Sequence, residues 1–372
     1  MKPRRVALFI NTLNRGGTER NVAVLCQHMD KSRYLPEVWT LHSGGGYEAT
    51  IRAAGVEIHS LGRKRSYSPA FALRAAREIS RSDADLFHVF LPAMMFYVGL
   101  ARTVCRAAQP IVFSEATSLV TSRWQQPVRA WTVRTQCAGY AANSDASRAF
   151  LSTYGVPPAR IRVIPNGHDI SHFRTPLDRH VVRTAIGVGP QDKLAIFVGR
   201  LVDTKRVCDL VEAVRLLSDQ AGLLRVVIVG DGPERSALEA QVLQAKLTDS
   251  VQFLGTRRDV TDLLRAADLF VFPSEMEGLS NAMIEAALAG LPIVGCDIGG
   301  VRDVVESGQQ CLLVPTRDPQ AFAGAMRRYL YDDELALRHG AAARNHAEQA
   351  YAIENTLERL YSLYDQVLGA KS

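Results

Sequence analysis

Residues 269–296 read LFVFPSEMEGLSNAMIEAALAGLPIVGC, and this stretch decides the fold. Leu269–Phe272 is a wholly apolar run, typical of a strand that is buried on both faces. A turn of small and polar residues follows, after which Asn281–Ala289 has the composition of a helix. Ile293–Cys296 is a second apolar strand. The order strand, helix, strand predicts a parallel βαβ unit.

The same alternation extends over the whole chain, with a polar break in the middle. The expected strands are 6–10, 37–41, 56–59, 85–90, 110–113, 139–143 and 160–164, then 194–199, 225–229, 251–255, 269–272, 293–296 and 311–314. The polar segment 171–192 between the two sets is the expected linker. Two doubly wound α/β domains in tandem, at residues 1–170 and 178–349, are the simplest arrangement. The helical stretch 350–372 has no strand after it and could pack on either domain, including back on the first.

Composition is typical of a soluble globular protein. The chain has 372 residues, of which 47% are apolar, and this is enough for two buried cores. No window reaches the ~18 uncharged apolar residues that a membrane-spanning helix needs. The nearest, residues 86–101, has the pattern of a strand followed by a helix. The six cysteines lie far apart without a Cys-x-x-Cys pair, which argues against a disulfide framework or a zinc site and fits a reducing cytoplasm.

Charge is distributed unevenly along the chain. Residues 1–170 contain 22 Lys and Arg against 11 Asp and Glu, whereas residues 171–372 contain 22 against 27. A basic first half favours an anionic partner, either a membrane surface or a charged acceptor. The alternative is a chance excess of arginine. Nucleic acid is not expected, because the chain has no recognition-helix, RNA-recognition or zinc-finger pattern.

One predicted helix of the first half has a basic face. Arg74, Arg77 and Arg81 recur at spacings of three and four, and residues 63–65 form a basic loop before them. We therefore expect this domain to dock on the anionic inner face of a membrane, where a lipid-linked acceptor would be found. The alternative is a solvated basic face, because Glu78 lies beside the stripe.

The loop between residues 273 and 281 has the features of an anion site. Ligands of open α/β sheets bind at the carboxyl ends of the strands. The helix N-terminus that can hold a diphosphate is formed by the amides of Gly278, Leu279, Ser280 and Asn281. Glu277 and Glu285 lie eight residues apart, one in the loop and one in the helix. Each can accept hydrogen bonds from hydroxyls on either side of a diphosphate. The alternative for Glu285 is a solvent-facing position.

Two cations follow the first strand of the second half. The strand ends at Gly199 and is followed by Arg200 and, five residues later, Lys205. Departure of a nucleoside diphosphate places negative charge on its phosphates, and two preorganised cations stabilise that charge as it forms. The alternative is an exposed basic loop that also contains Arg206.

The Glu-x7-Glu pattern of Glu277 and Glu285, with Gly290-Leu291-Pro292 after it, resembles glycosyltransferase family 4, the retaining enzymes of the GT-B fold. The resemblance extends to Gly199-Arg200-Leu201-x3-Lys205, Gly230-Asp231-Gly232-Pro233, Val163-Ile164-Pro165-Asn166-Gly167-x-Asp169 and Gly299-Gly300-Val301-x-Asp303. It implies an α/β GT-B fold, in which two Rossmann-like domains face each other across a cleft.

The resemblance also assigns roles to residues. It implies that Glu277 contacts the transferred sugar, Glu285 the ribose, and Arg200 with Lys205 the diphosphate, so that Glu277, Arg200 and Lys205 form the catalytic set. Further donor-binding positions implied in this way are Gly17 in the Gly-Gly loop of the first domain, Gly199, and the strand end at Leu254 and Gly255, which would meet the nucleobase.

The first domain matches the family less well. Many relatives have a His-x-His-x-Pro segment, whereas this chain reads His88-Val89-Phe90-Leu91-Pro92, and residues 113–118 contain no histidine. His88 and Glu115 are the candidates for an acceptor-side or catalytic residue, and a structural role is the alternative for each. In such enzymes the leaving phosphate can itself accept the acceptor's proton, so the reaction needs no protein nucleophile.

These features together predict a retaining hexosyltransferase. It would move sugar from a UDP- or GDP-sugar to a hydroxyl of a lipid-linked or cell-envelope glycan precursor, at the inner face of the membrane. No metal or other cofactor is expected, because the chain has no Asp-x-Asp motif and its cations can supply the charge. A nicotinamide dehydrogenase is disfavoured, since no Gly-x-Gly-x-x-Gly follows a strand. A nucleotide-sugar epimerase of the same fold and a non-catalytic scaffold subunit remain as alternatives.

Overall fold

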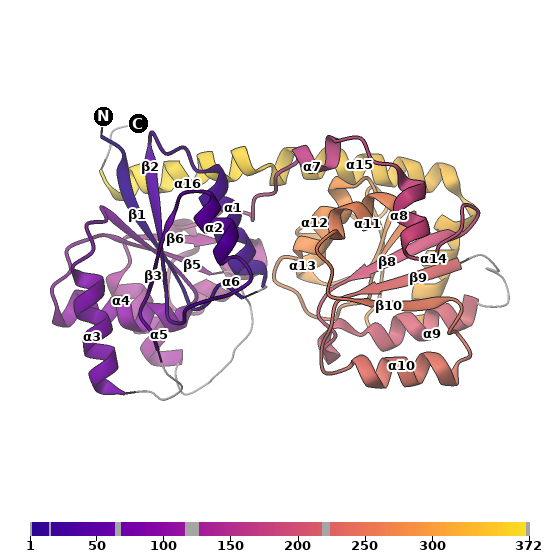
Figure 1. Ribbon diagram of the computed structural model, residues 1–372, viewed down its shortest axis with the longest axis horizontal. Coiled ribbons are helices and arrows are strands. Elements are labelled where there is room, and N and C mark those ends of the chain that lie inside the picture. Colours follow the sequence, from indigo (N-terminus) through magenta and orange to yellow (C-terminus); the bar gives the residue numbers. More distant parts are fainter. Residues whose placement is uncertain (1, 15, 64–67, 116–125, 218–223, 370–372) are drawn as a thin grey trace. The chain divides into compact units, whose positions relative to one another are not determined.

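The protein consists of two compact units, shown in Figure 1. The computed structural model describes residues 2–14, 16–63, 68–115, 126–217 and 224–369. The first unit comprises Met1–Asp169 and Tyr351–Ser372, and the second comprises Ile170–Ala350. The chain thus passes into the second unit at Ile170 and returns at Tyr351, close to the positions at which the sequence pattern changes.

The first unit contains a parallel sheet in which every strand expected for the first half is present. Among the described residues, seven strands lie in the order β3-β2-β1-β4-β5-β6-β7. They are β1 (Arg4–Ile10), β2 (Tyr34–Thr40), β3 (Glu57–Ser60), β4 (Leu86–Phe90), β5 (Ile111–Glu115), β6 (Gly139–Ala142) and β7 (Ile161–Val163). Their ends differ from the predicted ones by at most three residues.

Helices cover both faces of this sheet. They are α1 (Gly17–His28), α2 (Glu48–Ala53), α3 (Pro69–Ser80), α4 (Pro92–Val104), α5 (Gln126–Gln136), α6 (Asp145–Ser152), the 3-10 turn η2 (Pro158–Arg160) and α16 (Ile353–Val367). Ala7 and Phe9 of β1 belong to the core that α3 and α4 cover, whereas Val6, Leu8 and Ile10 belong to the core under α1 and α16. Successive side chains of a strand point to opposite faces, so a strand between two helix layers is apolar throughout.

The last helix, α16, belongs to the first unit. Its residues Ile353, Leu360 and Tyr364 are buried in the same core as Val6 and Leu8. The sequence left open which domain this helix covers, and the buried face of α16 resolves the question in favour of the first.

The first helix, α1, starts at Gly17, and its N-cap residue Gly16 makes no side-chain cap hydrogen bond. Thr18 lies in the first turn. Glu19, also in the first turn, places a negative charge at the positive end of the helix dipole.

The most apolar stretch, residues 86–101, is a strand followed by a helix, as its pattern predicts. β4 ends at Phe90, and α4 begins at Pro92, where a proline needs no N–H partner. In the part of the chain that the structure describes, no helix combines the length and the apolar character that crossing a bilayer requires.

The second unit contains a similar sheet. Its described strands lie in the order β10-β9-β8-β11-β12-β13 and are all parallel. They are β8 (Lys193–Val198), β9 (Leu224–Val229), β10 (Val251–Gly255), β11 (Leu269–Phe272), β12 (Ile293–Cys296) and β13 (Leu312–Val314). Its helices are α7 (Ser171–Arg174), α8 (Arg179–Ala185), η3 (Asp203–Lys205), α9 (Val207–Leu217), α10 (Arg235–Gln244), α11 (Val260–Ala266), α12 (Asn281–Leu288), α13 (Gly299–Arg302), α14 (Pro319–Tyr331) and α15 (Asp333–Tyr351).

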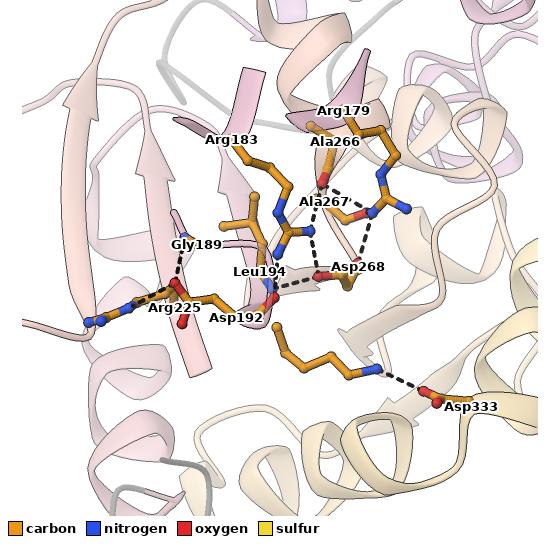
Figure 2. A network of polar contacts seen from close by, with 11 residues as sticks. Arg179, Arg183, Gly189, Asp192, Leu194, Arg225, Ala266, Ala267, Asp268 and Asp333 are labelled. Atoms are coloured by element: carbon orange, nitrogen blue, oxygen red, sulfur yellow. Dashed lines mark hydrogen bonds and ion pairs between the residues drawn. The ribbon is translucent and has the colours of Figure 1, made fainter. Parts of the chain in front are cut away.

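The expected linker, residues 171–192, is partly helical and is fixed to the second sheet. Figure 2 shows Arg179 and Arg183 of α8 on the Asp268 carboxylate, at 2.8 and 3.0 Å. The Leu194 amide donates to the same carboxylate at 2.8 Å. The linker expected at residues 171–192 thus contains a helix, α8, that is bound to the second sheet. Polar composition did not distinguish a solvated segment from one whose arginines pair with a carboxylate.

Candidate functional site

The order of the second sheet places a crevice at the carboxyl ends of β8 and β11. The chain runs from β8 to β9 and β10 on one side, and then returns to add β11, β12 and β13 on the other. The loops after β8 and β11 therefore leave the sheet in different directions. This switch point is where open α/β sheets bind ligands. The two loops contain residues 199–206 and 273–280.

The loop after β8 is fixed by its neighbours on the sheet edge. The Gly199 amide donates to the Val229 carbonyl at 3.0 Å, and the Leu201 amide donates to the Asp231 carbonyl at 2.9 Å. Leu201 is fully buried. The backbone on either side of Arg200 is thus held while its side chain stays exposed.

Gly230 allows the loop after β9 to lie directly against this backbone. A Cβ at Gly230 would lie 1.8 Å from the Gly199 carbonyl oxygen, and φ of Gly230 is +137°. Glycine is therefore required there for both reasons. The Gly230 amide also donates to the Gly255 carbonyl at 2.8 Å, which links the ends of β9 and β10. The sequence-predicted positions Gly199, Leu254 and Gly255 thus lie along one edge.

Lys205 and Glu277 meet at the switch point. The Lys205 ammonium, at the end of η3, forms an ion pair with the Glu277 carboxylate in the loop after β11. Their side chains are 18% and 13% exposed, so the pair is largely removed from water. The Lys205 nitrogen also lies 5.2 Å from the ring centroid of Phe272, the last residue of β11. Charges with this little hydration interact strongly with any further charge placed beside them.

Arg200 differs from Lys205 in having no partner of its own. Within the described residues, its guanidinium makes no hydrogen bond or ion pair, and the residue is exposed. Its carbonyl accepts a hydrogen bond from the Val202 amide at 3.0 Å, which fixes the local backbone. The side chain is therefore free to bind an anion at the edge of the second sheet.

The start of α12 supplies amides to the same edge. Ser280 is the N-cap of α12, and its hydroxyl accepts from the Met283 amide at 3.3 Å. The amides of the first turn point out of the helix, as an anion site requires. Glu285, one turn into the helix, is only 6% exposed, so the solvent-facing alternative is wrong.

The Glu277 loop is also supported from the side of α13. A Cβ on Gly300 would lie 2.4 Å from the Glu277 carbonyl oxygen and 2.6 Å from that of Gly278. Any side chain at Gly300 would therefore displace the loop. This close approach gives a physical reason for the Gly299-Gly300 pair noted in the sequence.

His88 has the environment of a core histidine. It is 1% exposed on β4, with Nδ1 2.6 Å from the Tyr364 hydroxyl and Nε2 2.6 Å from the Ser114 hydroxyl. Burial lowers the pKa of His88 to about 3, so the ring is neutral at neutral pH. With both ring nitrogens bonded inside the core, the geometry favours the structural alternative.

The other first-unit positions lie at the carboxyl edge of their own sheet. Glu115 is the last residue of β5 and is 1% exposed, and the residues after it, 116–125, lie outside the described part. Gly17 is the exposed first residue of α1, after the loop that follows β1. Both therefore occupy the edge at which α/β sheets bind ligands, whereas His88 points into the core.

Sequence reasoning missed the groups that hold the two loops. Glu275, two residues before Glu277, binds Arg317, which follows β13. Arg206, directly after Lys205, binds Asp209. Only the i,i+3 spacing of Arg206 and Asp209 on a helix start could have indicated a contact.

The arrangement is suited to an anionic ligand. A diphosphate at this edge would meet Arg200, Lys205 and the first-turn amides of α12. Lys205 could transfer its contact from Glu277 to a phosphate, and Glu277 would then be free to accept hydroxyl hydrogen bonds.

Two family models match consecutive parts of the chain. The model described as Glycosyltransferase Family 4 matches residues 15–172, and that described as Glycosyl transferases group 1 matches residues 192–332.

Curated relatives match over a shorter range. The D-inositol 3-phosphate glycosyltransferase of Jonesia denitrificans is 31% identical over 250 residues, covering 64% of this chain and 59% of that protein. The protein of the same name from Geodermatophilus obscurus is 36% identical over 236 residues, covering 60% and 51%. The chain thus spans little more than half the length of these relatives.

Solved structures match over the whole chain. Anabaena HepE, in complex with UDP and glucose, has a TM-score of 0.86 at 20% identity and covers 97% of this chain and 99% of that one. A glycosyltransferase from Rickettsia africae has a TM-score of 0.88 at 17% identity, with full coverage of both chains. The likeness shows the fold, two Rossmann-like domains of the GT-B type, as the sequence predicted.

Proposed function

Because the chain belongs to glycosyltransferase family 4, we propose that it transfers a hexose-type sugar from a nucleoside-diphosphate donor to a hydroxyl acceptor. The observation that carries this proposal is the Lys205–Glu277 ion pair at the switch point of the second sheet, with Arg200 in the loop after β8 at the same sheet edge. A carboxylate, two cations and a helix N-terminus at one sheet edge suit a ligand that contains both hydroxyls and a diphosphate.

In the proposed complex, Arg200 and Lys205 bind the diphosphate and Glu277 accepts hydrogen bonds from the sugar. Glu285 accepts from the ribose, and the strand end at Leu254 and Gly255 meets the base. The two cations hold the leaving group where negative charge develops, which lowers the barrier without reorganisation. The leaving phosphate accepts the acceptor's proton, and the sugar keeps its anomeric configuration.

A screen of donors tests the proposal directly. The complex of Anabaena HepE contains UDP and glucose, so UDP-sugars come first, followed by GDP- and ADP-sugars. The expected result is a thermal shift with one nucleotide class, and release of that nucleoside diphosphate when acceptor is added. Absence of binding to every class would overturn the proposal, and isomerisation of the donor without transfer would favour an epimerase.

The positive charge of Arg200 and Lys205 takes the place of a divalent metal in this proposal. Turnover should therefore survive EDTA. Complete loss of activity, restored by manganese or magnesium, would contradict this part of the proposal.

The acceptor we propose is a lipid-linked or cell-envelope glycan precursor, reached from the cytoplasmic side of the membrane. The support is a set of exposed basic side chains on the first unit. Arg74 and Arg77 of α3 and its C-cap residue Arg81 are exposed, while Ala75 and Ile79 are buried. Lys64 and Arg65 of the expected basic loop lie outside the described residues. An arginine near an anionic bilayer contributes on the order of 1 kcal/mol to binding.

Exposed aromatic side chains lie on the neighbouring helices. Phe96 of α4 is 51% exposed and Trp131 of α5 is 53% exposed. The three helices α3, α4 and α5 pack side by side in this order. Large aromatic rings are favoured at the headgroup level of a bilayer, so they strengthen the case for a membrane-facing surface.

Vesicle co-sedimentation tests this surface. Binding should require anionic lipid, fall with added salt and decrease when Arg74, Arg77 and Arg81 become Ser. The matched control replaces Arg215, Arg258 and Arg302 of the second unit, which removes the same charge. Equal recovery with neutral vesicles, or none with either, would contradict the proposed surface.

A further inference from the structure

Two residues beside the Lys205–Glu277 pair have a left-handed backbone without being glycine. Arg206, with φ +50°, follows Lys205 directly, and Arg317, with φ +59°, follows β13. An L-residue in this conformation brings its Cβ close to a carbonyl oxygen, a cost that glycine avoids. Such strain persists where other contacts hold it, and it is concentrated at functional sites.

The Arg317 guanidinium binds the Glu275 carboxylate in a bidentate pair. Nε donates to Oε2 at 2.7 Å, and Nη2 donates to Oε1 at 3.1 Å. Within the described part of the chain, these are the only hydrogen bonds or ion pairs of the Arg317 side chain. A planar fork holds a carboxylate in one orientation, which a lysine ammonium cannot do. The pair therefore ties the loop after β13 to the loop after β11.

Glu275 also connects to the lysine loop through its backbone. Its amide donates to the Thr204 carbonyl at 3.0 Å, one residue before Lys205. One residue thus contacts both the arginine anchor and the loop that carries the ammonium group. On the far side of Lys205, Arg206 holds Asp209 with bonds of 3.0 and 2.9 Å.

We propose that Arg317 and Glu275 are positioning residues, which set the separation of Lys205 and Glu277 in the donor site. The inference rests on the proposed function for its effect on turnover. Glycine would adopt the backbone of residue 317 without strain, yet the chain has an arginine there whose guanidinium bonds Glu275 alone among the described residues. Retention of a strained arginine is explained if its side chain fixes the Glu277 loop.

Arg317→Gly separates this role from a structural one. Glycine adopts the positive φ of residue 317 without strain, and it also removes the guanidinium that binds Glu275. We expect the melting temperature to stay the same or rise, while kcat falls roughly ten- to a hundredfold from misplacement of the reacting groups. The KM for the donor should change less than kcat, since Arg200 and the helix amides remain. Amides 274–278 should exchange hydrogen faster than in the wild type.

Lys246→Gly is the matched control. Lys246 has φ +55°, is exposed and lies at the end of α10, so the substitution relieves the same strain and removes the same charge. It should leave kcat and loop exchange unchanged. Arg317→Lys, which keeps the charge but not the fork, should recover only part of the lost turnover. Glu275→Gln keeps the backbone bond to Thr204 and should also give a partial loss.

Two outcomes overturn the proposal. One is an Arg317→Gly variant with wild-type kcat and unchanged exchange of amides 274–278. The other is a lower melting temperature with normal turnover of the folded protein, which would assign the pair to stability. Should the wild type act on no sugar donor, the proposed function fails, and the exchange measurement still decides whether Arg317 fixes the loop.

Discussion

Charged side chains cluster at both edges of the second sheet, and the two clusters are built differently. At the amino edge, Asp268 accepts from Arg179, Arg183 and the Leu194 amide, as Figure 2 shows. At the carboxyl edge, Lys205 has one carboxylate partner, Glu277.

The difference lies in how many partners each charge has. A charged group whose hydrogen-bonding positions are occupied by several protein partners has few left for a ligand, and its contacts stabilise the fold. A partly buried charge with one partner can exchange that partner for a ligand at little cost, and such groups concentrate at functional sites. By this criterion we infer a structural role for the Asp268 cluster and a ligand-binding role for the Lys205 cluster, although each pairs a carboxylate with basic side chains.

Replacing Glu277 by Ala should have the largest effect. We expect turnover to fall about a thousandfold or more, as when a group that stabilises the transition state is lost. The free energy of unfolding should fall by only about 1–2 kcal/mol, because the Lys205 ammonium loses its carboxylate partner but remains 18% exposed. Steady-state kinetics and thermal unfolding measure both quantities. Near-wild-type turnover would remove the distinction between the two edges.

Asp268→Ala should show the opposite pattern. It leaves the Arg183 guanidinium, 9% exposed, with carbonyl partners only, and should lower the free energy of unfolding by about 3 kcal/mol. The kcat of the folded protein should not change. Asp333→Ala is the control, since the Lys193–Asp333 pair is exposed and should contribute under about 1 kcal/mol. Equal stability of the two variants would contradict the comparison.

Lys205→Ala tests the cation itself. Loss of one charge-assisted contact should weaken binding of the cognate nucleoside diphosphate by about 1.5–3 kcal/mol, measured by calorimetry. Lys246→Ala, remote from both loops in the sequence, should bind as the wild type does. Unchanged affinity in Lys205→Ala would show that the ammonium does not meet the diphosphate.

His88 extends the comparison to the first sheet and should give the smallest effect. Its folded pKa, about 3, lies below the unfolded value near 6.5, so the unfolded chain binds more protons between these values. The stability it contributes is complete above about pH 6.5 and is lost as the pH falls, by at most about 1.4 kcal/mol per unit. Urea unfolding at pH 7, 6 and 5 should show a shallower dependence for His88→Gln. Parallel curves would mean that His88 does not titrate on unfolding.

The elements of the fold could be predicted because each depends on a local pattern. Val226–Val229 and Leu269–Phe272 are apolar throughout, which in a parallel sheet reflects burial on both faces. The Glu277 loop was predictable for the same reason, since strand, loop and helix are contiguous in the sequence.

Contacts between distant residues could not be predicted in this way. His88 and Tyr364 are 276 positions apart, and no periodicity connects them. Nor does any sequence pattern connect Arg317 with Glu275. Several loops contain carboxylates, and the sequence does not indicate which of them Arg317 binds. The role of α8 was missed because its arginines, Arg179 and Arg183, bind a carboxylate 89 and 85 positions away.

The return of α16 to the first unit has a consequence for synthesis on the ribosome. The second unit is one uninterrupted segment, so it can fold as soon as residue 350 has emerged. The first unit, although translated earlier, lacks one of the two helices that cover Val6, Leu8 and Ile10 until Ile353–Val367 has been made. The unit that is translated first is therefore completed last. During that interval the part of this apolar face that α1 leaves open is exposed, and transiently exposed apolar surface favours aggregation.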